Sequence, residues 1–480
     1  MAAVAPQRRG VVQREDLARN LAVSLVGGDW SEAALRGVLE RRLPRALRKA
    51  APALAARLVE RLPGPVAPPV DRVAAALAAE PRFEGVHGFC ARRSVWPDPD
   101  LTSPRMAPVA ALAGYGVPDL PTAAALAEWL AIPVERLDYV ADVTGRHAAH
   151  DEMAVNHYTY AVLRRPDGRV RVIEAPKPGL KALQRRILRG IVGKVPVHAD
   201  AFAFVPGRSC REGAARHAGE AVVLRFDLRD FFPSLGAGRV QGLFRLAGYP
   251  EPVARLLTGL CTTRTPLRVV DRFPAAERAI WRARHLPQGA PTSPALANLA
   301  VFGLDRRLAG LARSLGAAYS RYADDMTFSG DIGIAEPLLQ IVPAIVAEEG
   351  LVLNCAKTRV MRATGRQVVT GIVVNRAINI DRRYYDRLKA VIHACGRPGD
   401  GRLDDPSFRA RIVGQIDWVG SVSAAKGEKL RALLVRAAER RAAGQGAGET
   451  AIAGLVRHSA AMLITGSMPE RMSSARWHLI

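Results

Sequence analysis

The most constraining feature of this chain is a pair of adjacent carboxylates inside an apolar, strand-like segment. Asp324 and Asp325 stand at the expected turn of a hairpin, YSRYADDMTFSG, over residues 319–330. The following Met326 and Phe328 alternate with polar residues, which is typical of a half-buried strand. Two carboxylates at the end of such a hairpin repel each other, and this is costly without a cation. An Asp-Asp pair in a turn is more often simply solvated, so the pair alone does not establish a site.

A second acidic position strengthens the case. Asp227 ends the apolar run VVLRFD, residues 222–227, and a carboxylate at the end of a buried strand is unusual without a partner. Two strands from distant parts of the sequence, each presenting Asp, can hold two Mg²⁺ ions about 3.5–4 Å apart. Carboxylate oxygens suit this ion, with Mn²⁺ as a substitute. We therefore predict a two-metal phosphoryl-transfer centre at Asp227, Asp324 and Asp325.

The overall charge points to a polyanionic partner. The 480 residues include 69 Lys and Arg against 45 Asp and Glu, a formal net charge of +24, and the isoelectric point is about 10.8. This excess favours nucleic acid. The alternative is coding bias toward arginine, although such bias need not unbalance the acids. Charge alone does not separate an enzyme from a passive binder.

Composition excludes several classes of protein. The five cysteines are scattered without a CxxC pair, which argues against a zinc ribbon and a disulfide framework. No apolar run approaches the ~18 residues of a membrane span, and the N-terminus lacks the pattern of a signal peptide. We expect a cytoplasmic globular protein with reduced thiols and no membrane association.

The order of expected elements favours an α+β fold. Proline-rich stretches at 63–69 and 96–108 divide an N-terminal region of helices from the rest. The further elements expected from periodicity and turn signals are helices over 14–62, 72–79 and 122–143, a strand pair around a turn at Pro166, Asp167 and Gly168, a basic helix over 180–192, a strand over 221–227, helices to about 261, a long helix from Pro294, a helix over 335–349, a strand pair around VVTGIVVN and a basic helical tail from Arg382.

Three motifs together resemble those of the reverse transcriptases. They are FDLRDFFPS, which contains Asp227, LPQGAPTSP at 286–294 and YADD at 322–325, and they occur in the family's order. The resemblance extends over roughly residues 120–440. Within the family the chain is most similar to bacterial retron enzymes of the myxobacterial type, with an N-terminal extension.

Two shorter segments carry the resemblance to retron enzymes. Val369-Thr370-Gly371 is similar to the VTG signature, and EGAARHAG resembles the NAxxH segment, with His217 in place and Gly213 where Asn is usual. The resemblance implies that His217, Thr370 and Gly371 take part in RNA binding. The alternative for His217 is a histidine whose hydrogen bonds are satisfied within a loop.

The resemblance also implies a nucleotide site. Arg171 would contact the incoming triphosphate, because a guanidinium fork suits phosphate oxygens. Phe232 would clash with a 2′-hydroxyl and so select deoxynucleotides, while Gln288 and Gly289 would shape the nascent base-pair pocket. Lys357 would act near the leaving pyrophosphate. The alternatives are an ordinary strand arginine, a core phenylalanine and a surface lysine.

A right-hand polymerase architecture is the fold that the resemblance implies. It comprises fingers, a palm of antiparallel sheet plus helices, and a helical thumb that includes GQIDWVGSV at 414–422, preceded by a mainly helical extension. The expected boundaries are 1–105 for the extension, 106–220 for N-terminal helices and fingers, 221–375 for the palm with interleaved fingers elements, and 376–480 for the thumb. The extension is expected to bind RNA or a protein partner.

The function implied is an RNA-directed DNA polymerase that copies a structured partner non-coding RNA into single-stranded DNA from dNTPs. Retron enzymes begin synthesis at a guanosine 2′-hydroxyl, which gives a branched RNA–DNA molecule (msDNA), and they are linked to anti-phage defence through an effector encoded nearby. One alternative is another bacterial reverse transcriptase, of the group II intron or diversity-generating type. The other is a catalytically silent RNA-binding scaffold of a defence complex, which would keep its function when all three Asp are changed to Asn.

Overall fold

The chain folds into two compact units that both combine helices with antiparallel strands. The first unit lies within Met1–Val197 and Asp230–Phe302, and the second within His198–Arg229 and Gly303–Ile480. The computed structural model describes residues 12–26, 30–63, 68, 70–97, 104–149, 155–164, 170–275 and 278–445. Mixed helices and antiparallel sheets confirm the predicted α+β class. Among the described residues, no helix is long and apolar enough to cross a membrane.

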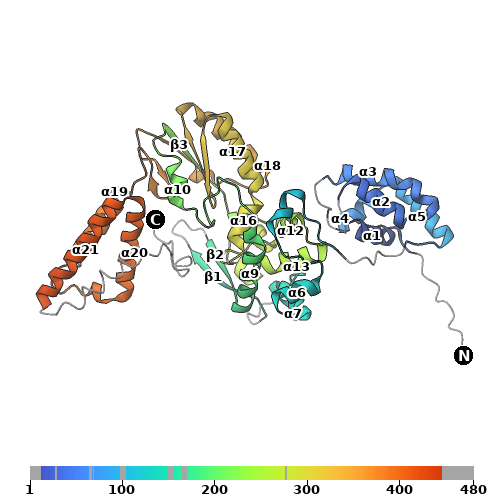
Figure 1. Ribbon diagram of the computed structural model, residues 1–480, viewed down its shortest axis with the longest axis horizontal. Coiled ribbons are helices and arrows are strands. Elements are labelled where there is room, and N and C mark those ends of the chain that lie inside the picture. Colours follow the sequence, from blue (N-terminus) through green and yellow to red (C-terminus); the bar gives the residue numbers. More distant parts are fainter. Residues whose placement is uncertain are drawn as a thin grey trace. The chain divides into compact units, whose positions relative to one another are not determined.

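The N-terminal helices of the first unit, drawn in blue in Figure 1, share a core of their own. Leu17, Leu35, Leu54, Leu77 and Phe83 are fully buried in one cluster. Burial of such side chains contributes about 1.5–3 kcal/mol each, which makes this cluster the main source of local stability. The helices are α1 (Arg14–Leu25), α2 (Glu32–Arg42), α3 (Ala51–Arg61), α4 (Val70–Ala78) and α5 (Pro81–Arg93).

The rest of the first unit surrounds a two-stranded antiparallel sheet of β1 (Tyr158–Arg164) and β2 (Val170–Pro176). The predicted turn at Pro166 to Gly168 between these strands lies outside the described residues. The helices are α6 (Ala123–Leu130), α7 (Val134–Ala141), α8 (Arg146–Ala149), α9 (Pro178–Gly190), α11 (Phe231–Ser234), α12 (Ala237–Leu246), α13 (Glu251–Cys261), α14 (Leu267–Val270), α15 (Arg278–Arg282) and α16 (Ser293–Ala300).

Helix α9 is strongly amphipathic, as its sequence predicts. Pro178 stands in its first turn, where the missing N–H removes no helical hydrogen bond. Leu180, Gln184 and Ile187 are buried along one face at helical spacing, and basic side chains lie on the outer face. The helix therefore fixes a positively charged surface on the first unit.

The second unit is built on a four-stranded antiparallel sheet in the order β4-β5-β3-β6. Strand β3 lies inside the sheet, which explains its nearly continuous apolar sequence. The strands are β3 (Val222–Asp227), β4 (Ala318–Tyr322), β5 (Asp325–Gly330) and β6 (Arg359–Arg362), with a separate pair of β7 (Val368–Val369) and β8 (Ile372–Val373). The helices are α10 (Cys210–Ala215), α17 (Phe302–Ser314), α18 (Ala335–Glu348), α19 (Arg382–Ala394), α20 (Pro406–Val422) and α21 (Ala424–Gln445).

The C-terminal helices pack on one another, and α20 and α21 run side by side (Figure 1). Their buried Ile412, Ile416 and Leu430 belong to a cluster that also contains Val369 and Ile372 of the β7–β8 pair. One detail of the sequence prediction is wrong. The long helix expected from Pro294 is two helices, α16 and α17, which are separated at Val301.

Candidate active site

Strand pairing places two of the three predicted aspartates directly opposite each other. Strands β3 and β5 are antiparallel, and in their register Asp227 faces Asp325. The backbone N–H of Leu228 donates to the carbonyl of Asp324 at 2.9 Å, so the turn is held against the end of β3. Ala323 completes this turn with a φ of +57°, in the left-handed region. The three aspartates thus occupy one end of the sheet.

The Asp227 carboxylate is nearly buried and already has two partners. One of its oxygens accepts from the side-chain amide of Asn354 at 3.1 Å. The other pairs with the ammonium of Lys357 at 2.8 Å. The Asp227 side chain is 7% exposed, whereas Lys357 is 46% exposed and reaches solvent. The structure therefore brings together two residues that the sequence assigned to different tasks.

Asp325 is paired with a cation from the neighbouring strand. Both of its carboxylate oxygens accept from one guanidinium nitrogen of Arg225 at 2.9 Å. Arg225 and Asp227 are two residues apart on β3 and so project from the same face of the sheet. The sequence reasoning did not single out Arg225, although this spacing on the strand was visible in it.

Asp324 carries the electrostatic strain of the site. Burial, followed by the charges of Asp325 and Asp227, raises the pKa of Asp324 from 3.8 to about 6. An ionised carboxylate is therefore disfavoured here in the absence of a counter-ion. The ammonium of Lys357 acts in the opposite direction but is a smaller influence on this pKa.

The donor set suits a hard divalent cation. The oxygens of Asp227, Asp324 and Asp325 are the ligand type that Mg²⁺ and Mn²⁺ take, and a cation would relieve the repulsion felt at Asp324. Within the described part of the chain, no three His, Cys, Asp or Glu side chains are already arranged as a metal cluster. Lys357 and Arg225 supply the positive charge instead. The residues fit such an ion chemically, and it would compete with these two cations for the carboxylate oxygens.

Two predicted nucleotide-site residues, Arg171 and Gln288, meet in the first unit. With the amide oxygen of Gln288 facing Arg171, it accepts from Arg171 Nε at 3.0 Å and Nη2 at 2.8 Å, and the amide nitrogen donates to the Val172 carbonyl at 3.2 Å. The backbone carbonyl of Gln288 also accepts from the N–H of Glu174 at 2.8 Å. Strand β2 and the loop that contains Gln288 are thus joined through main chain and side chain.

Gly289 is required by this close approach. Its φ is +134°, which side-chain-bearing residues rarely adopt, and a Cβ there would lie 3.0 Å from the carbonyl oxygen of Glu174. The absence of a side chain at Gly289 therefore lets this loop pack directly on the backbone of β2. Whether Arg171, Gln288 and Gly289 contact a nucleotide stays a prediction.

A buried ion pair between strand β2 and the segment before Gln288 also fixes this loop. Glu174 and His285 are both fully buried, with His285 Nε2 3.0 Å from a Glu174 oxygen. The other Glu174 oxygen accepts from Thr265 Oγ1 at 2.7 Å. Burial alone would lower the pKa of His285, but the charge and hydrogen bond of Glu174, together with the Ala283 carbonyl, raise it above 6.5. The Glu174 pair therefore favours the protonated ring more than water does, and His285 lies three residues before Gln288.

We expect His285→Gln to destabilise the protein by about 3 kcal/mol at pH 6, because it leaves Glu174 buried without its counter-ion. The stabilisation that comes from the raised pKa of His285 is complete below pH 6.5. It is lost as the pH rises through the pKa of His285 in the folded protein. The gap in melting temperature between wild type and variant should therefore narrow as the pH rises above 6.5 and passes through the folded-state pKa of His285. The exposed His393→Gln serves as the control. A gap that is constant with pH would show that His285 is neutral in the fold.

Phe232 lies in the short helix α11, half exposed beside the buried Phe231, and the two ring centroids are 5.5 Å apart. A partly accessible ring is compatible with contact to a sugar and differs from the alternative of a fully buried core residue. Asp230, at the start of this helix, has a φ of +48°. The role of Phe232 as a selector of deoxynucleotides stays a prediction.

His217 is buried, and this corrects the prediction that its side chain contacts RNA. The ring is 0% exposed and lies between two hydroxyls, with Nδ1 2.8 Å from Ser329 Oγ and Nε2 2.7 Å from Ser320 Oγ. Burial, and then the charge of Arg216, lowers the pKa of His217 from 6.5 to about 3, so the ring is neutral. His217 therefore ties the segment after α10 to strands β4 and β5, as in the alternative of a satisfied histidine.

Thr370 and Gly371 form the two-residue turn between β7 and β8 and are half exposed. Both have positive φ, +47° and +82°, as this kind of hairpin turn requires, although a β-branched residue rarely adopts it. Thr370 Oγ1 donates to the Val369 carbonyl at 2.8 Å. An RNA contact at this turn stays a prediction.

A second buried ion pair, which the sequence reasoning missed, supports the YADD hairpin. Arg321 and Asp305 are both 0% exposed, and Nε and Nη2 of Arg321 each donate to a different Asp305 oxygen at 2.7 Å. Arg321 Nη1 also donates to the carbonyl of Ala323 at 2.9 Å, within the turn. The signal in the sequence was a charged residue at an inward position of an apolar strand.

Comparison with known proteins identifies a polymerase family. The family model described as reverse transcriptase (RNA-dependent DNA polymerase) matches residues 163–374. Among solved structures, the telomerase from Candida albicans in complex with a fragment of telomeric RNA aligns with 9% identity and a TM-score of 0.35, over 91% of this chain and 86% of that one. The foamy viral protease-reverse transcriptase in complex with an RNA/DNA hybrid aligns with 14% identity and a TM-score of 0.31, over 56% and 28%.

Sequence relatives are much more similar. The retron Mx65 reverse transcriptase of Myxococcus xanthus is 42% identical over 328 residues, which are 67% of this chain and 73% of that protein. The retron Mx162 reverse transcriptase of the same organism is 37% identical over 66% of this chain and 67% of that protein. The retron Ec86 reverse transcriptase of Escherichia coli is 36% identical over 49% and 69%. With this identity and coverage, the chain belongs to the retron reverse transcriptases, a family of RNA-directed DNA polymerases.

Proposed function

We propose that this polymerase copies a structured partner non-coding RNA into single-stranded DNA, starting from a 2′-hydroxyl of that RNA to give a branched RNA–DNA molecule. The observation that carries the proposal is the pairing of Asp227 with Asp325 across β3 and β5, with Asp324 at the adjoining turn. The similarity to retron enzymes supports the choice of RNA and primer. A role in anti-phage defence with a neighbouring effector protein is part of the same proposal.

In this proposal Asp227, Asp324 and Asp325 hold two Mg²⁺ ions. When bound, such ions supply Lewis acidity and neutralise phosphate charge. Lys357, once it leaves Asp227, offers its ammonium to the departing pyrophosphate, which suits an exposed lysine on a flexible stem. Arg171 presents its guanidinium to the triphosphate of the incoming dNTP. Gln288 and Gly289 line the pocket for the new base pair.

The remaining assignments follow the expected domain division of 1–105, 106–220, 221–375 and 376–480. Phe232 excludes ribonucleotides by blocking the space of a 2′-hydroxyl. The helices after residue 376 and the turn at Thr370 and Gly371 hold the RNA, mainly through phosphate contacts and shape. Binding of RNA should therefore weaken as salt rises.

The test is purification of the protein co-expressed with the RNA locus that flanks its gene. We expect a DNA product that remains attached to RNA after denaturation and gains mobility after ribonuclease treatment. The matched control carries Asn at Asp227, Asp324 and Asp325, and it should yield no DNA. A DNA product without attached RNA would contradict the priming step, and an absence of DNA from the intact enzyme would contradict polymerisation of this RNA.

The scaffold alternative is separated from the polymerase by a phage challenge with the same triple variant. If protection depends on the DNA product, the variant loses both DNA and protection. Retained protection without DNA would favour the scaffold.

A further inference from the structure

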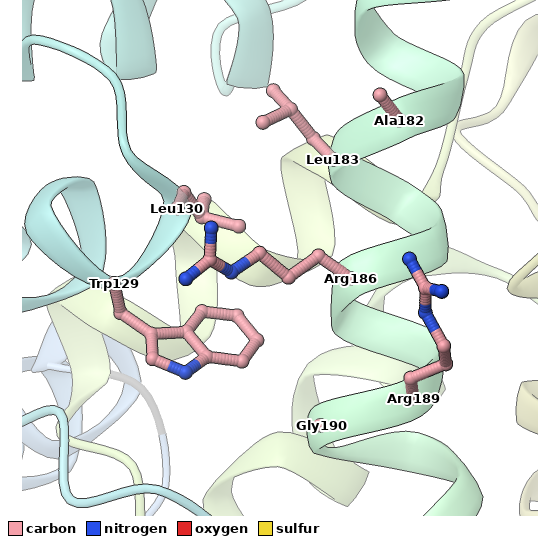
Figure 2. A pocket seen from close by; sticks show the side chains of 7 residues that line it. All are labelled: Trp129, Leu130, Ala182, Leu183, Arg186, Arg189 and Gly190. Carbon is pink, nitrogen blue, oxygen red and sulfur yellow. The ribbon is translucent and has the colours of Figure 1, made fainter.

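A pocket of about 560 Å³ lies in the first unit between the end of α6 and the outer face of α9 (Figure 2). Trp129 lines it from α6, and Leu183, Arg186 and Arg189 line it from α9. Of the described residues that line the pocket, none is acidic. The volume falls within the range of sites for small ligands, and it is large enough for a nucleotide.

The indole of Trp129 is fixed in position from two sides. A Cβ at Gly190 would lie 2.5 Å from Cζ2 of Trp129, so the ring packs directly on the glycine backbone of α9. The guanidinium carbon of Arg186 lies 5.3 Å from the centre of the indole, within cation–π range. Figure 2 shows the Arg186 side chain extending toward the tryptophan. The pocket therefore presents a fixed indole with a guanidinium held close to it.

The positive charge continues beyond the pocket. Lys181 and Arg185 lie on the same helix as Arg186 and Arg189, and the three arginines are exposed. A single small ligand would not use a cationic surface that extends past its own site. Flat stacking groups between cations match a nucleobase with phosphates on either side of it, which is how proteins hold unpaired RNA.

We propose that this pocket binds an unpaired base of single-stranded RNA, which stacks on Trp129 beside Arg186 while Arg189 contacts a flanking phosphate. The site would anchor the partner RNA through residues that do not belong to the carboxylate centre, and it rests on the proposed function only in that an RNA partner is needed. Duplex RNA, whose bases are already stacked, would not occupy it.

The test measures binding of a fluorescein-labelled oligoadenylate to the full-length protein by anisotropy, with an RNA hairpin of equal charge as the second probe. We expect Trp129→Leu to weaken oligoadenylate binding about tenfold and to change hairpin binding less than about twofold, since stacking is lost and charge is kept. Trp129→Phe should restore most of the affinity. Gly190→Ala, which displaces the indole, should weaken binding in the same direction.

Arg185→Gln and Arg186→Gln form the matched pair, because both remove one exposed charge from the same helix. Arg186→Gln should weaken oligoadenylate binding more than Arg185→Gln, and only Arg186→Gln should do so selectively over the hairpin. The site would be overturned if Trp129→Leu and Arg186→Gln weakened binding of oligoadenylate and of the hairpin equally. It would also be overturned if Trp129→Leu and Gly190→Ala left oligoadenylate binding unchanged. Binding of a fluorescein-labelled glutamate- and leucine-rich peptide that is lost with Trp129→Leu, while oligoadenylate binding is unchanged by that substitution, would likewise overturn it in favour of a protein partner. None of these results depends on RNA-primed DNA synthesis, so a failure of that proposal is seen separately.

Discussion

Asp324→Asn is expected to lower DNA synthesis by roughly a thousandfold or more while raising the stability of the metal-free protein. Loss of one carboxylate from the centre removes charge needed to hold divalent cations, and several kcal/mol of transition-state stabilisation correspond to about three orders of magnitude in rate. The pKa of about 6 shows that the Asp324 charge is disfavoured by burial and by Asp325 and Asp227. A neutral amide at position 324 removes this unfavourable charge, which should raise the free energy of unfolding by about 1–3 kcal/mol at neutral pH.

The measurements are primer extension on an RNA template and thermal unfolding in the presence of a chelator. Asp331→Asn is the control, because it removes the same charge from an exposed position just after β5. It should change neither activity nor melting temperature appreciably. An Asp324→Asn enzyme that retains activity would remove Asp324 from the catalytic centre. A variant that is less stable than the wild type would mean that Asp324 is held by favourable contacts.

Arg321→Met is expected to destabilise the second unit by about 3–5 kcal/mol, because Asp305 would be left charged and fully buried. The turn would also lose the hydrogen bond from Arg321 to the carbonyl of Ala323. For a unit of this size the loss corresponds to a fall of about 10 °C in melting temperature. Activity should fall as well, since Asp324 and Asp325 follow directly after that turn.

The matched control is Arg307→Met, which breaks ion pairs with Glu348 and Glu349 on the surface and should have little effect on melting. The double variant Arg321→Met with Asp305→Leu should recover part of the lost stability, because no uncompensated charge remains. If Arg321→Met unfolds at the same temperature as the wild type, the buried pair does not stabilise the hairpin.

The sequence predicted the frame of the carboxylate centre because strands and motifs are local patterns. Alternation around Asp324 and the apolar run before Asp227 marked the strands, and the register of β3 with β5 then brought the carboxylates together. The alternation could not show that Lys357 and Asn354 pair with Asp227, because their spacing of more than a hundred residues is bridged only by the fold.

His217 and His285 show that the role of a histidine could not be predicted from the sequence. The resemblance of EGAARHAG to the NAxxH segment implied an RNA-binding role for His217, yet its ring is buried between two serines of the sheet. His285 attracted no attention in the sequence, yet it neutralises Glu174 beneath the loop of Gln288. Burial decides the role of each, and burial depends on the tertiary packing of segments that are far apart in sequence.

The core shared by α1 to α5 has a consequence for the history of the gene. The leucines between Leu17 and Leu77 pack against one another within this segment, together with Phe83 and Cys90. A segment whose apolar side chains pack against one another can be joined to a polymerase, or lost from it, by recombination. Neither piece is then left with a large exposed apolar surface. Relatives that differ in this segment can therefore share the same copying machinery, and new specificities can be acquired by exchange of a whole module rather than by gradual substitution.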